Sequence, residues 1–478
     1  MRNWDDSRKI TTRLVLTGDL LLTTPAHMGN GDRGAGVDLV LQRDPLEGCP
    51  LLPGTSIAGA LRAYLQAHEY GYRKPEQKEQ RTSLAQQLFG GTKRDPHGNQ
   101  SPLIVDDAFA DQPLVEIRDG VGIDPKRRVA KEGIKYDMEL LPAGTIFPLR
   151  FELLLSEGGA ATAIEQALAM ALHGLERGEI ALGARRSRGF GRCRVDGWRL
   201  ARYDLHEPND LLRWLCADLD APPETPLGKI SELLGAPTTD DARNAVRLVS
   251  SFELASPLLI RAEQPLRAAD GAPLLGDTQP DVIHLVNARG LPVLPGTSLA
   301  GALRARAARI LRMFHDDDQV KKRQESLFGW TSQGDGGTPS ASRLLVEEVV
   351  IEQARTLVQS RVGIDRFTGG AYDTALFHEA PCVAGQVQTT ITIINPQDHE
   401  IGLLLLLLKD LWSGDLPLGG GASVGRGRLR GVTATLSWDT RQWQLSADAD
   451  QRLHVAGDPA ELEGFVAAVA RKEDTHAA

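Results

Sequence analysis

The sequence predicts an α+β protein made of two tandem copies of one domain of the split βαβ kind, with helices on one face of a sheet. The segment LPGTSIAGALRA, which begins at Leu52, recurs 242 residues later as LPGTSLAGALRA, with eleven of twelve residues identical. Strand-like and helix-like segments also alternate in the same order within each half. A repeat distance near half of the 478 residues indicates a duplicated domain, because solenoid repeats are about 20–50 residues long.

Four further landmarks recur in the same order, which leaves little room for coincidence. They are LFG at Leu88 and Leu327, SPLIVDDAF from Ser101 with SRLLVEEVV from Ser342, VGID ending at Asp124 and Asp365, and LGARRSRGFGRCR from Leu182 with LGGGASVGRGRLR from Leu418. The landmarks predict four segments: a first domain over 1–205, a connector over 206–244, a second domain over 245–440 and a C-terminal extension over 441–478.

Each element of the first copy has a local signal. RLVLTGDLLLTT from Arg13 alternates as a strand does. Pro53 and Gly54 form a turn, and Thr55 or Ser56 is expected to cap the helix that follows. A short strand (SPLIVDDAF), a long strand (AGTIFPLRFELLL), a second amphipathic helix (AIEQALAMALHGLERG) and a closing strand (RCRVDGWRL) complete the copy.

Composition indicates a globular protein of the cytoplasm. The chain opens with charged residues and no secretory signal, and its longest apolar run, IGLLLLLLKDLW, is too short for a membrane span of about 20 residues. Its four cysteines are scattered without CxxC spacing, which argues against disulfides and against a zinc site. The net charge of −9 means that a nucleic-acid partner would be held by local basic patches.

Two features of each copy suggest binding of a phosphate chain. The PGTS turn places free N–H groups at a helix N-terminus, where an anion is favoured, although an ordinary capped helix is the plain alternative. The closing loops combine glycines with arginines, a pattern that fits RNA better than a glycine-rich turn with a solvated basic rim. GIDPKRRVAKEGIK from Gly122 predicts a second basic segment, a hairpin.

The PGTS helix, the LFG turn, GIDRFTGGAYDTALFHE and the SRGFGR loop together resemble the RAMP superfamily of CRISPR–Cas proteins, and more narrowly the backbone subunits of type III effector complexes. The resemblance covers both copies. It implies two tandem palms of the RNA-recognition-motif (ferredoxin-like) fold, each with an inserted thumb β-hairpin. The hairpin of the second copy would lie at residues 365–379. Its counterpart in the first copy, at residues 124–139, lacks the TGG and LF of the second. A fused double backbone of this kind is similar to those of subtype III-D.

The resemblance also implies a function, which is binding of guide RNA and cleavage of complementary target RNA. Its implied partners are guide RNA, target RNA, a large signalling subunit, a small subunit and other RAMP backbone subunits, with no membrane. The candidate RNA-binding residues come from the PGTS helices, the hairpins and the Gly/Arg loops: Thr55, Ser56, Arg62, Lys126, Arg127, Arg128, Arg185, Arg186, Arg188, Arg192, Thr297, Ser298, Arg304, Arg366, Arg426 and Arg428.

The resemblance places a catalytic carboxylate in the loop before each PGTS helix. Asp38 in the first copy and Asp281 in the second are the equivalents, and each is also the expected ligand of a divalent cation, Mg²⁺ or Mn²⁺. The expected reaction is attack of an RNA 2′-OH on the adjacent phosphate. On residue types alone, a loop aspartate more often makes a turn, so the plain alternative is a backbone that binds RNA without cutting it.

Other candidates are weaker. His27 and His284 lie near these loops but do not align with one another, so we expect structural or substrate-contacting roles. That disfavours a third hypothesis, a metal-independent, histidine-based nuclease that processes guide RNA. The acidic pairs Asp106-Asp107 and Glu347-Glu348 are expected to form a solvated acidic edge rather than a paired-carboxylate site.

Overall fold

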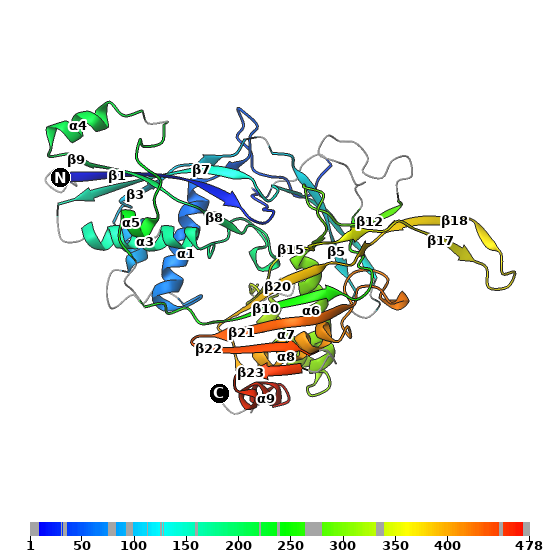
Figure 1. Cartoon of the computed structure of the whole chain (residues 1–478). Coiled ribbons are helices and arrows are strands. Elements are labelled where there is room, and N and C mark those ends of the chain that lie inside the picture. Colours follow the sequence, from blue (N-terminus) through cyan, green and yellow to red (C-terminus); the bar gives the residue numbers. More distant parts are fainter. Residues whose placement is uncertain are drawn as a thin grey trace. The chain divides into compact units, whose positions relative to one another are not determined.

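The computed structural model (Figure 1) describes residues 9–29, 31, 36–74, 83–91, 99–111, 113–124, 127, 129–157, 161–218, 221–236, 240–262, 280–330, 339–448 and 453–471. The chain divides into two compact units. The first comprises residues 1–115, 139–186 and 190–243, and the second comprises 116–138, 187–189 and 244–478. Two segments from the first half of the sequence therefore belong to the second unit.

An antiparallel sheet forms the palm of the first unit. Its central strands are β1 (Ile10–Leu22) and β7 (Ile146–Ser156), paired so that Leu14 faces Leu153. Strand β3 (Leu103–Val105) lies beside β7, and β8 (Cys193–Val195) and β9 (Arg199–Asp204) lie beside β1. The four core strands thus have the edge-to-edge order of a ferredoxin-like fold.

Helices cover the buried face of this sheet. Strand β7 alternates buried and less buried residues, as a sheet with one covered face does. Its buried face shares one core with α1 (Gly54–Tyr70), α2 (Leu84–Phe89) and α3 (Ala161–Glu176). The two helices predicted from apolar periodicity are therefore confirmed as α1 and α3.

The second unit repeats this topology. Strands β10 (Ala245–Leu254) and β20 (Gln386–Ile394) take the places of β1 and β7, and β14 (Leu344–Val346) and β21 (Leu429–Trp438) occupy the outer positions. Leu248 faces Ile391 across the central pair, as Leu14 faces Leu153 in the first unit. The expected α+β class with two tandem palms is confirmed.

The helical layer of the second unit comprises α6 (Gly296–Leu311), α7 (Asp317–Phe328) and α8 (Asp398–Trp412). The leucine run lies in α8 as a buried helix, as expected, and shares one core with the sheet. Among the described residues, we find no helix with the length and apolar character needed to cross a membrane.

The C-terminal segment extends the second palm, which the sequence analysis did not foresee. Strands β22 (Arg441–Ala447) and β23 (Leu453–Ala456) join β21 and widen the sheet to six strands. Helix α9 (Pro459–Ala468) packs on α8 so closely that a Cβ on Gly402 would lie 1.9 Å from the carbonyl oxygen of Phe465. Only glycine permits this approach.

Both palms carry an inserted hairpin, as expected. The first pairs β5 (Glu116–Ile123) with β6 (Ala130–Leu140), and the second pairs β17 (Gln359–Ile364) with β18 (Ala371–Ala380). Each hairpin begins several residues before the segment that the resemblance implied. Figure 1 shows the second hairpin, in yellow, extending well beyond its palm sheet.

The remaining elements are short. They are β2 (Leu51–Leu52), β4 (Ala108–Phe109), α4 (Pro208–Leu215), α5 (Ile230–Leu233), β11 (Arg261–Ala262), β12 (Val282–His284), β13 (Val293–Leu294), β15 (Val349–Val350), β16 (Arg355–Thr356) and β19 (Cys382–Val383). Helices α4 and α5 confirm the helical character expected of the connector. The connector lies in the first unit, and the second unit resumes at Asn244.

The PGTS helices begin differently from the prediction. Pro53 and Pro295 are the N-cap residues, neither makes a side-chain cap hydrogen bond, and the hydroxyl residues lie inside the first turn. The expectation that Thr55 or Ser56 caps the helix is therefore wrong. The first helix instead receives an acidic partner, because Gly54 N–H donates to Asp107 Oδ1 at 2.6 Å. The anion that the helix dipole favours is here one of the protein's own carboxylates.

Candidate catalytic loops and nucleic-acid interface

Asp38 and Asp281 lie at equivalent points of the two repeats. Asp38 immediately precedes Leu39, whose carbonyl oxygen accepts the N–H of Glu139 at 2.9 Å. Asp281 immediately precedes Val282, which pairs in parallel with Glu379. Each aspartate is exposed and lies beside the end of the hairpin's second strand. The two candidate catalytic residues thus share one setting, although much of each loop, including residues 32–35 and 263–279, lies outside the described residues.

The second aspartate is tied to its hairpin by a hydrogen bond. Asp281 Oδ2 accepts the backbone N–H of His378 at 2.7 Å. That bond fixes the carboxylate against β18. Because the hairpin and the candidate catalytic loop are joined here, a change in the position of one would move the other.

The two repeats differ in the partners of the glutamate near the end of the hairpin's second strand, Glu139 in the first and Glu379 in the second. In the first, Glu139 Oε2 accepts the N–H of Leu41 at 3.0 Å and pairs with Arg43 at 3.3 Å. In the second, Glu379 is 5% exposed and its Oε2 lies 2.7 Å from Arg426 and 3.1 Å from Arg361. Loss of Arg426 would leave the buried Glu379 with a weaker partner, which is costly for a buried charge.

One candidate carboxylate in each repeat is compatible with a divalent cation. Magnesium in nucleotide-handling sites is often held by one or two protein carboxylates, with phosphate oxygens and water as the other ligands. Asp38 and Asp281 each supply one hard oxygen donor group near the surface. Within the described ranges, no group of three or more His, Cys, Asp or Glu side chains is placed to hold a metal ion by itself.

The two histidines are buried and occupy non-equivalent positions. His27 is 6% exposed, with Nδ1 2.9 Å from the carbonyl oxygen of Glu139, and its counterpart in the second repeat is the buried Leu259. His284 is 4% exposed, and its counterpart in the first repeat is the buried Leu41. The carbonyl oxygen of His27 accepts the N–H of Ala184, and the carbonyl oxygen of Leu259 accepts the N–H of Gly420. Because Ala184 and Gly420 are equivalent positions of the two Gly/Arg loops, His27 and Leu259 are equivalent positions of the two repeats.

His284 is a neutral structural residue. Its Nδ1 accepts the N–H of Ile260 at 3.2 Å, so Nε2 carries the proton and donates to Val293 O at 3.0 Å. Burial lowers its pKa from the ordinary 6.5 to about 4. A ring with both nitrogens engaged by backbone has no atom left for acid–base chemistry on RNA. Of the two roles expected for this histidine, structural or substrate-contacting, these contacts favour the structural one.

The Gly/Arg loops have one backbone shape in both repeats. Leu182 N–H donates to Gly191 O at 2.8 Å, and Leu418 N–H donates to Gly427 O at 2.9 Å. Gly191 and Gly427 have φ of 75° and 78°, and a Cβ on either would lie within 2 Å of the facing leucine carbonyl. The glycines permit close backbone approach, as predicted, and they do so within the loop itself.

The arginines of these loops are placed differently from one another. Arg186 and Arg428 are exposed, Arg185 and Arg192 are half-buried, and Arg192 Nη1 lies 3.5 Å from Gly178 O. Arg426 is 3% exposed and is held by Glu379 and by the Gln359 side chain. Contact between Arg426 and RNA would require this buried pair to break, so its side chain is better described as a support for the hairpin base.

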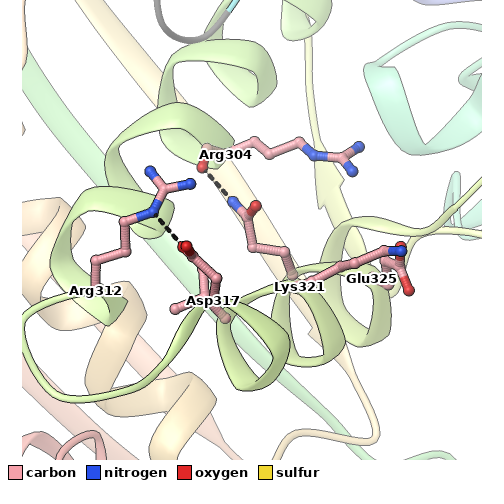
Figure 2. A pocket seen from close by; sticks show the side chains of 7 residues that line it. Arg304, Arg312, Asp317, Lys321 and Glu325 are labelled. Carbon is pink, nitrogen blue, oxygen red and sulfur yellow. Dashed lines mark hydrogen bonds and ion pairs between the residues drawn. The ribbon is translucent and has the colours of Figure 1, made fainter.

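The two helix arginines lie within the helical layers. Arg62 Nη1 donates to Gly90 O, at the end of α2, at 3.2 Å. Arg304 borders a cavity of about 200 Å³ between α6 and α7, and burial lowers its pKa (Figure 2). Its carbonyl oxygen accepts Gln324 Nε2 at 2.7 Å, while Arg312 pairs with Asp317 nearby. Both helix arginines contribute to packing of the LFG-containing helix.

The other candidates lie at exposed places. Arg366 and Arg127 are exposed near the tips of their hairpins, and the tip of the second is shaped by Asp365, whose pKa is lowered by N–H donors from Thr368 and Phe367. Thr55 and Ser56 are exposed, whereas Thr297 and Ser298 are half-buried. Arg188 is half-buried and belongs to the second unit. Lys126 and Arg128 lie outside the described residues.

Both repeats match the same family. The family described as "RAMPs: RAMP superfamily" matches residues 19–194 and again residues 251–430. The chain belongs to the RAMP superfamily. Each match covers much of one palm and includes one candidate aspartate, one PGTS helix, one hairpin and one Gly/Arg loop.

Two curated relatives of this RAMP chain carry the name "CRISPR system Cms endoribonuclease Csm3". The protein from Mycobacterium tuberculosis (strain ATCC 25618 / H37Rv) is 34% identical over 90 residues, which are 17% of this chain and 36% of that protein. The protein from Streptococcus thermophilus is 29% identical over 100 residues, 20% of this chain and 44% of that protein. The alignments thus span less than half the length of the curated relatives.

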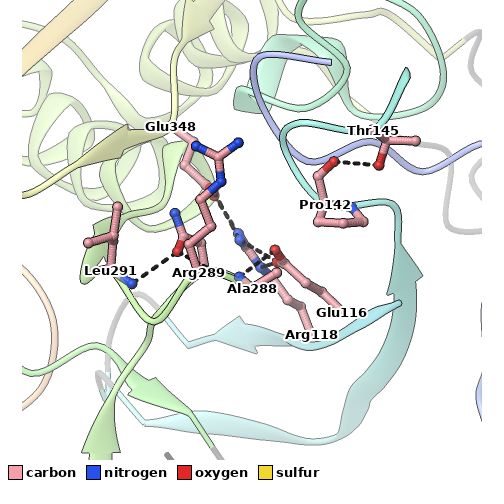
Figure 3. Close-up of polar contacts among 9 residues, drawn as sticks. Glu116, Arg118, Pro142, Thr145, Ala288, Arg289, Leu291 and Glu348 are labelled. Atoms are coloured by element: carbon pink, nitrogen blue, oxygen red, sulfur yellow. Dashed lines mark hydrogen bonds and ion pairs between the residues drawn. The ribbon is translucent and has the colours of Figure 1, made fainter. Parts of the chain in front are cut away.

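One buried ion-pair network escaped the sequence analysis. Arg118 on β5 is 6% exposed, with Nη2 2.8 Å from Glu116 Oε2 and 3.0 Å from Glu348 Oε1, and Nη1 also pairs with Glu348 (Figure 3). Burial lowers the pKa of Arg118, but the charge of Glu348 and then that of Glu116 outweigh it and raise the pKa. All three residues belong to the second unit.

The expectation of a solvated acidic edge therefore holds for one RAMP repeat and fails for the other. Asp106 and Asp107 are exposed, whereas Glu348 is 8% exposed and paired with Arg118. A signal was present in the sequence: Glu116 and Arg118 lie two apart on a strand and so share a face, while the second repeat has Leu357 and Gln359 there.

Proposed function

We propose that this RAMP chain is a guide-RNA-binding backbone subunit of a type III CRISPR effector complex and that it cuts complementary target RNA at its two candidate loops. The observation that carries the proposal is the double family match, with an exposed aspartate at the same point beside the hairpin in each copy. The names of the two relatives, both CRISPR endoribonucleases, support the same class of activity.

Binding would use the surfaces that the two repeats share. The hairpins extend exposed side chains, Arg127 in the first and Arg366 and Phe367 in the second, and the Gly/Arg loops add Arg186 and Arg428. Arginine provides phosphate contacts, and exposed aromatic side chains provide faces on which bases stack. We expect guide RNA to run along the loops and to be interrupted at each hairpin.

The proposed reaction is an internal transesterification. The 2′-oxygen of one ribose forms a bond to the adjacent phosphorus, and the bond from phosphorus to the 5′-oxygen breaks. The proton leaves the 2′-hydroxyl and one is delivered to the departing 5′-oxygen, so the products are a 2′,3′-cyclic phosphate and a 5′-hydroxyl. Asp38 and Asp281 would orient the 2′-hydroxyl or accept its proton.

Asp38 and Asp281 would also hold the divalent cation together with RNA phosphate oxygens. When bound, such a cation supplies Lewis-acid stabilisation of negative charge on the phosphate. The contribution of the chain itself is to fix each carboxylate against the base of its hairpin. In the second repeat the hydrogen bond from His378 N–H to Asp281 provides this orientation.

The second candidate function is a non-catalytic backbone that binds guide and target RNA only. One observation favours it: in the part of the chain that the structure describes, no group of three or more His, Cys, Asp or Glu side chains is placed to hold a metal ion. The two proposals differ in whether Asp38→Ala or Asp281→Ala removes a cut. A guide-processing nuclease based on histidine is less well supported, because each repeat has a buried leucine where the other has its histidine.

Cross-linking in the assembled complex tests the binding proposal. Guide RNA carrying 4-thiouridine is irradiated within the purified complex, and cross-linked peptides of this chain are identified by mass spectrometry. We expect cross-links to both hairpins and to the segments containing Arg186 and Arg428, and fewer to the buried Arg426. Cross-links to other subunits with none to this chain would reject the proposal.

A further inference from the structure

The second structural unit contains an interface between the first repeat's hairpin and the second repeat's palm. The hairpin, residues 116–138, contributes Arg118, which pairs with Glu348 next to β15. The same hairpin contributes Glu116, whose Oε1 accepts the backbone N–H of Ala288 at 2.9 Å (Figure 3). Two charged residues of the hairpin are therefore each matched by a specific group of the palm.

A second segment of the first repeat completes this interface. Residues 187–189 lie against the start of α6, where a Cβ on Gly296 would be 2.4 Å from the carbonyl oxygen of Arg188. A Cβ on Gly189 would be 2.3 Å from the nitrogen of Glu348. The backbones of the Gly/Arg loop and of the PGTS helix thus approach as closely as glycine allows.

The first repeat presents the equivalent palm surface, with an altered set of groups. Asp107 takes the place of Glu348 and is exposed. Pro45 takes the place of Ala288. The side chain of Asp44 accepts an N–H from two residues further on, as the side chain of Asn287 does in the second repeat, and Pro45 and Ala288 each follow that residue directly. A proline has no N–H, so this position offers no backbone donor to a hairpin carboxylate placed like Glu116. It does offer a carboxylate, because Asp107 engages Gly54 N–H through one oxygen and keeps further acceptor sites.

The second repeat presents the equivalent hairpin base, also altered. Gln359 replaces Arg118, and its Oε1 is taken up by Arg426 of its own repeat. Leu357 replaces Glu116 and is 46% exposed. Gly425, the counterpart of Gly189, would have no heavy atom of the described residues within 4 Å of an added Cβ. The second hairpin therefore lacks the arginine that holds the first hairpin on its palm.

We propose that the Arg118–Glu348 pair determines which hairpin seats on which palm, and that the Asp107 surface of the first repeat takes a hairpin with an arginine at the position of Arg118, supplied by a different RAMP chain. The second hairpin of another copy of this chain does not fit, because Gln359 brings no charge to Asp107. The chain thus occupies one place in an assembly and does not polymerise on itself.

The test converts the second hairpin into a copy of the first. The variant Gln359→Arg with Arg426→Phe restores the pair found in the first repeat, where Arg118 accompanies Phe190. Gln359→Arg alone serves as a second variant in case the double change impairs folding, which circular dichroism checks. Full-length chains without RNA are compared by sedimentation velocity over a concentration series, so the result does not depend on the proposed RNA function.

We expect the wild type to stay monomeric and the double variant to associate head to tail. The dissociation constant for self-association should be about tenfold lower or more than that of the wild type, because close charge pairs across interfaces contribute on this scale. Adding Asp107→Asn should abolish that association, whereas the matched change Asp106→Asn should leave it, because Asp106 already pairs with Arg150 at 3.5 Å. Wild-type association that Asp107→Asn disrupts would overturn the proposal. So would folded arginine variants that stay monomeric, or association that Asp107→Asn does not affect.

Discussion

The two repeats use the same palm and differ at the base of the hairpin. In the first, the hairpin arginine Arg118 reaches the carboxylate of Glu348, and the Gly/Arg loop has the buried Phe190. In the second, the hairpin has Gln359, and the arginine has moved to the loop as Arg426, where it pairs with Glu379 of the same repeat. The same fold can therefore place a buried arginine so that it pairs with the neighbouring repeat, as Arg118 does, or with the hairpin of its own repeat, as Arg426 does.

The candidate catalytic loops show the opposite pattern. Asp38 and Asp281 are retained at one point of both repeats, while the neighbouring buried positions exchange histidine for leucine. The aspartates are exposed, so packing does not require them. Their presence in both copies agrees with a shared role at the surface, whereas the histidines fill space in one copy each.

The largest effect is expected from removing Arg118. Arg118→Ala leaves Glu348 and Glu116 without their cation in a buried place and should destabilise the second unit by about 3–5 kcal/mol. Gln359→Ala, at the equivalent position, should cost less than about 1 kcal/mol because its amide is only half-buried. Hydrogen exchange of amides in α6 and β15 measures both. Equal effects of the two changes would contradict the proposed division of roles.

The Gly/Arg loops should respond alike in both repeats. Gly191→Ala and Gly427→Ala each force a Cβ onto a carbonyl oxygen at positive φ, and each should cost roughly 2 kcal/mol or more. Thermal unfolding of the single variants provides the comparison. If one loop tolerated the change, the shared backbone shape would not be a shared requirement.

Acid should destabilise the second repeat through His284. The unfolded histidine binds a proton below about 6.5, but the folded one does so only below about 4. Between these values the unfolded state binds more protons, so the free energy of unfolding falls as the pH falls, by at most about 1.4 kcal/mol per pH unit.

His284→Leu, which installs the residue of the first repeat, should remove this contribution. Urea unfolding at pH 7.5 and at pH 5.0 measures the difference, and His454→Leu, at an exposed position, is the control. An unchanged pH dependence in His284→Leu would show that the histidine is not the source.

The smallest stability effects are expected at the aspartates. Asp281→Ala removes one hydrogen bond to His378 N–H at the surface and should cost about 1 kcal/mol or less, and Asp38→Ala should cost no more. Thermal unfolding of the two variants checks this. A much larger loss at Asp281 would mean that it is a structural residue of the hairpin base.

Local patterns predicted the duplicated α+β domain, its main helices and the basic hairpin of the first repeat, because apolar periodicity and the repeated landmarks report directly on them. The hairpin of the second repeat was predicted from the resemblance to the RAMP superfamily. The C-terminal strands β22 and β23 were missed because they lie beyond the last repeated landmark, although β22 alternates buried and exposed residues as a strand does. The helix cap was misassigned because Pro53 precedes two plausible capping hydroxyls.

The contacts of the candidate site were harder to predict, because they join residues far apart in the chain. Arg118 and Glu348 are 230 positions apart, and nothing local marks Glu348 as buried. Arg426 lies in a glycine-rich segment that is typical of a solvated basic loop, yet its side chain is buried in an ion pair with Glu379. Only the comparison of one repeat with the other shows that these charges have been rearranged.

The most direct test of two catalytic loops is cleavage of a labelled complementary RNA by the assembled complex with Mg²⁺ or Mn²⁺. We predict that Asp38→Ala and Asp281→Ala each slow one discrete cut by about 100-fold or more, that the double variant slows both, and that target binding persists. Asp44→Ala, which alters a turn in the first loop, should keep both cuts. If the double variant still made every cut at the wild-type rate, the chain would be a scaffold without catalytic activity of its own.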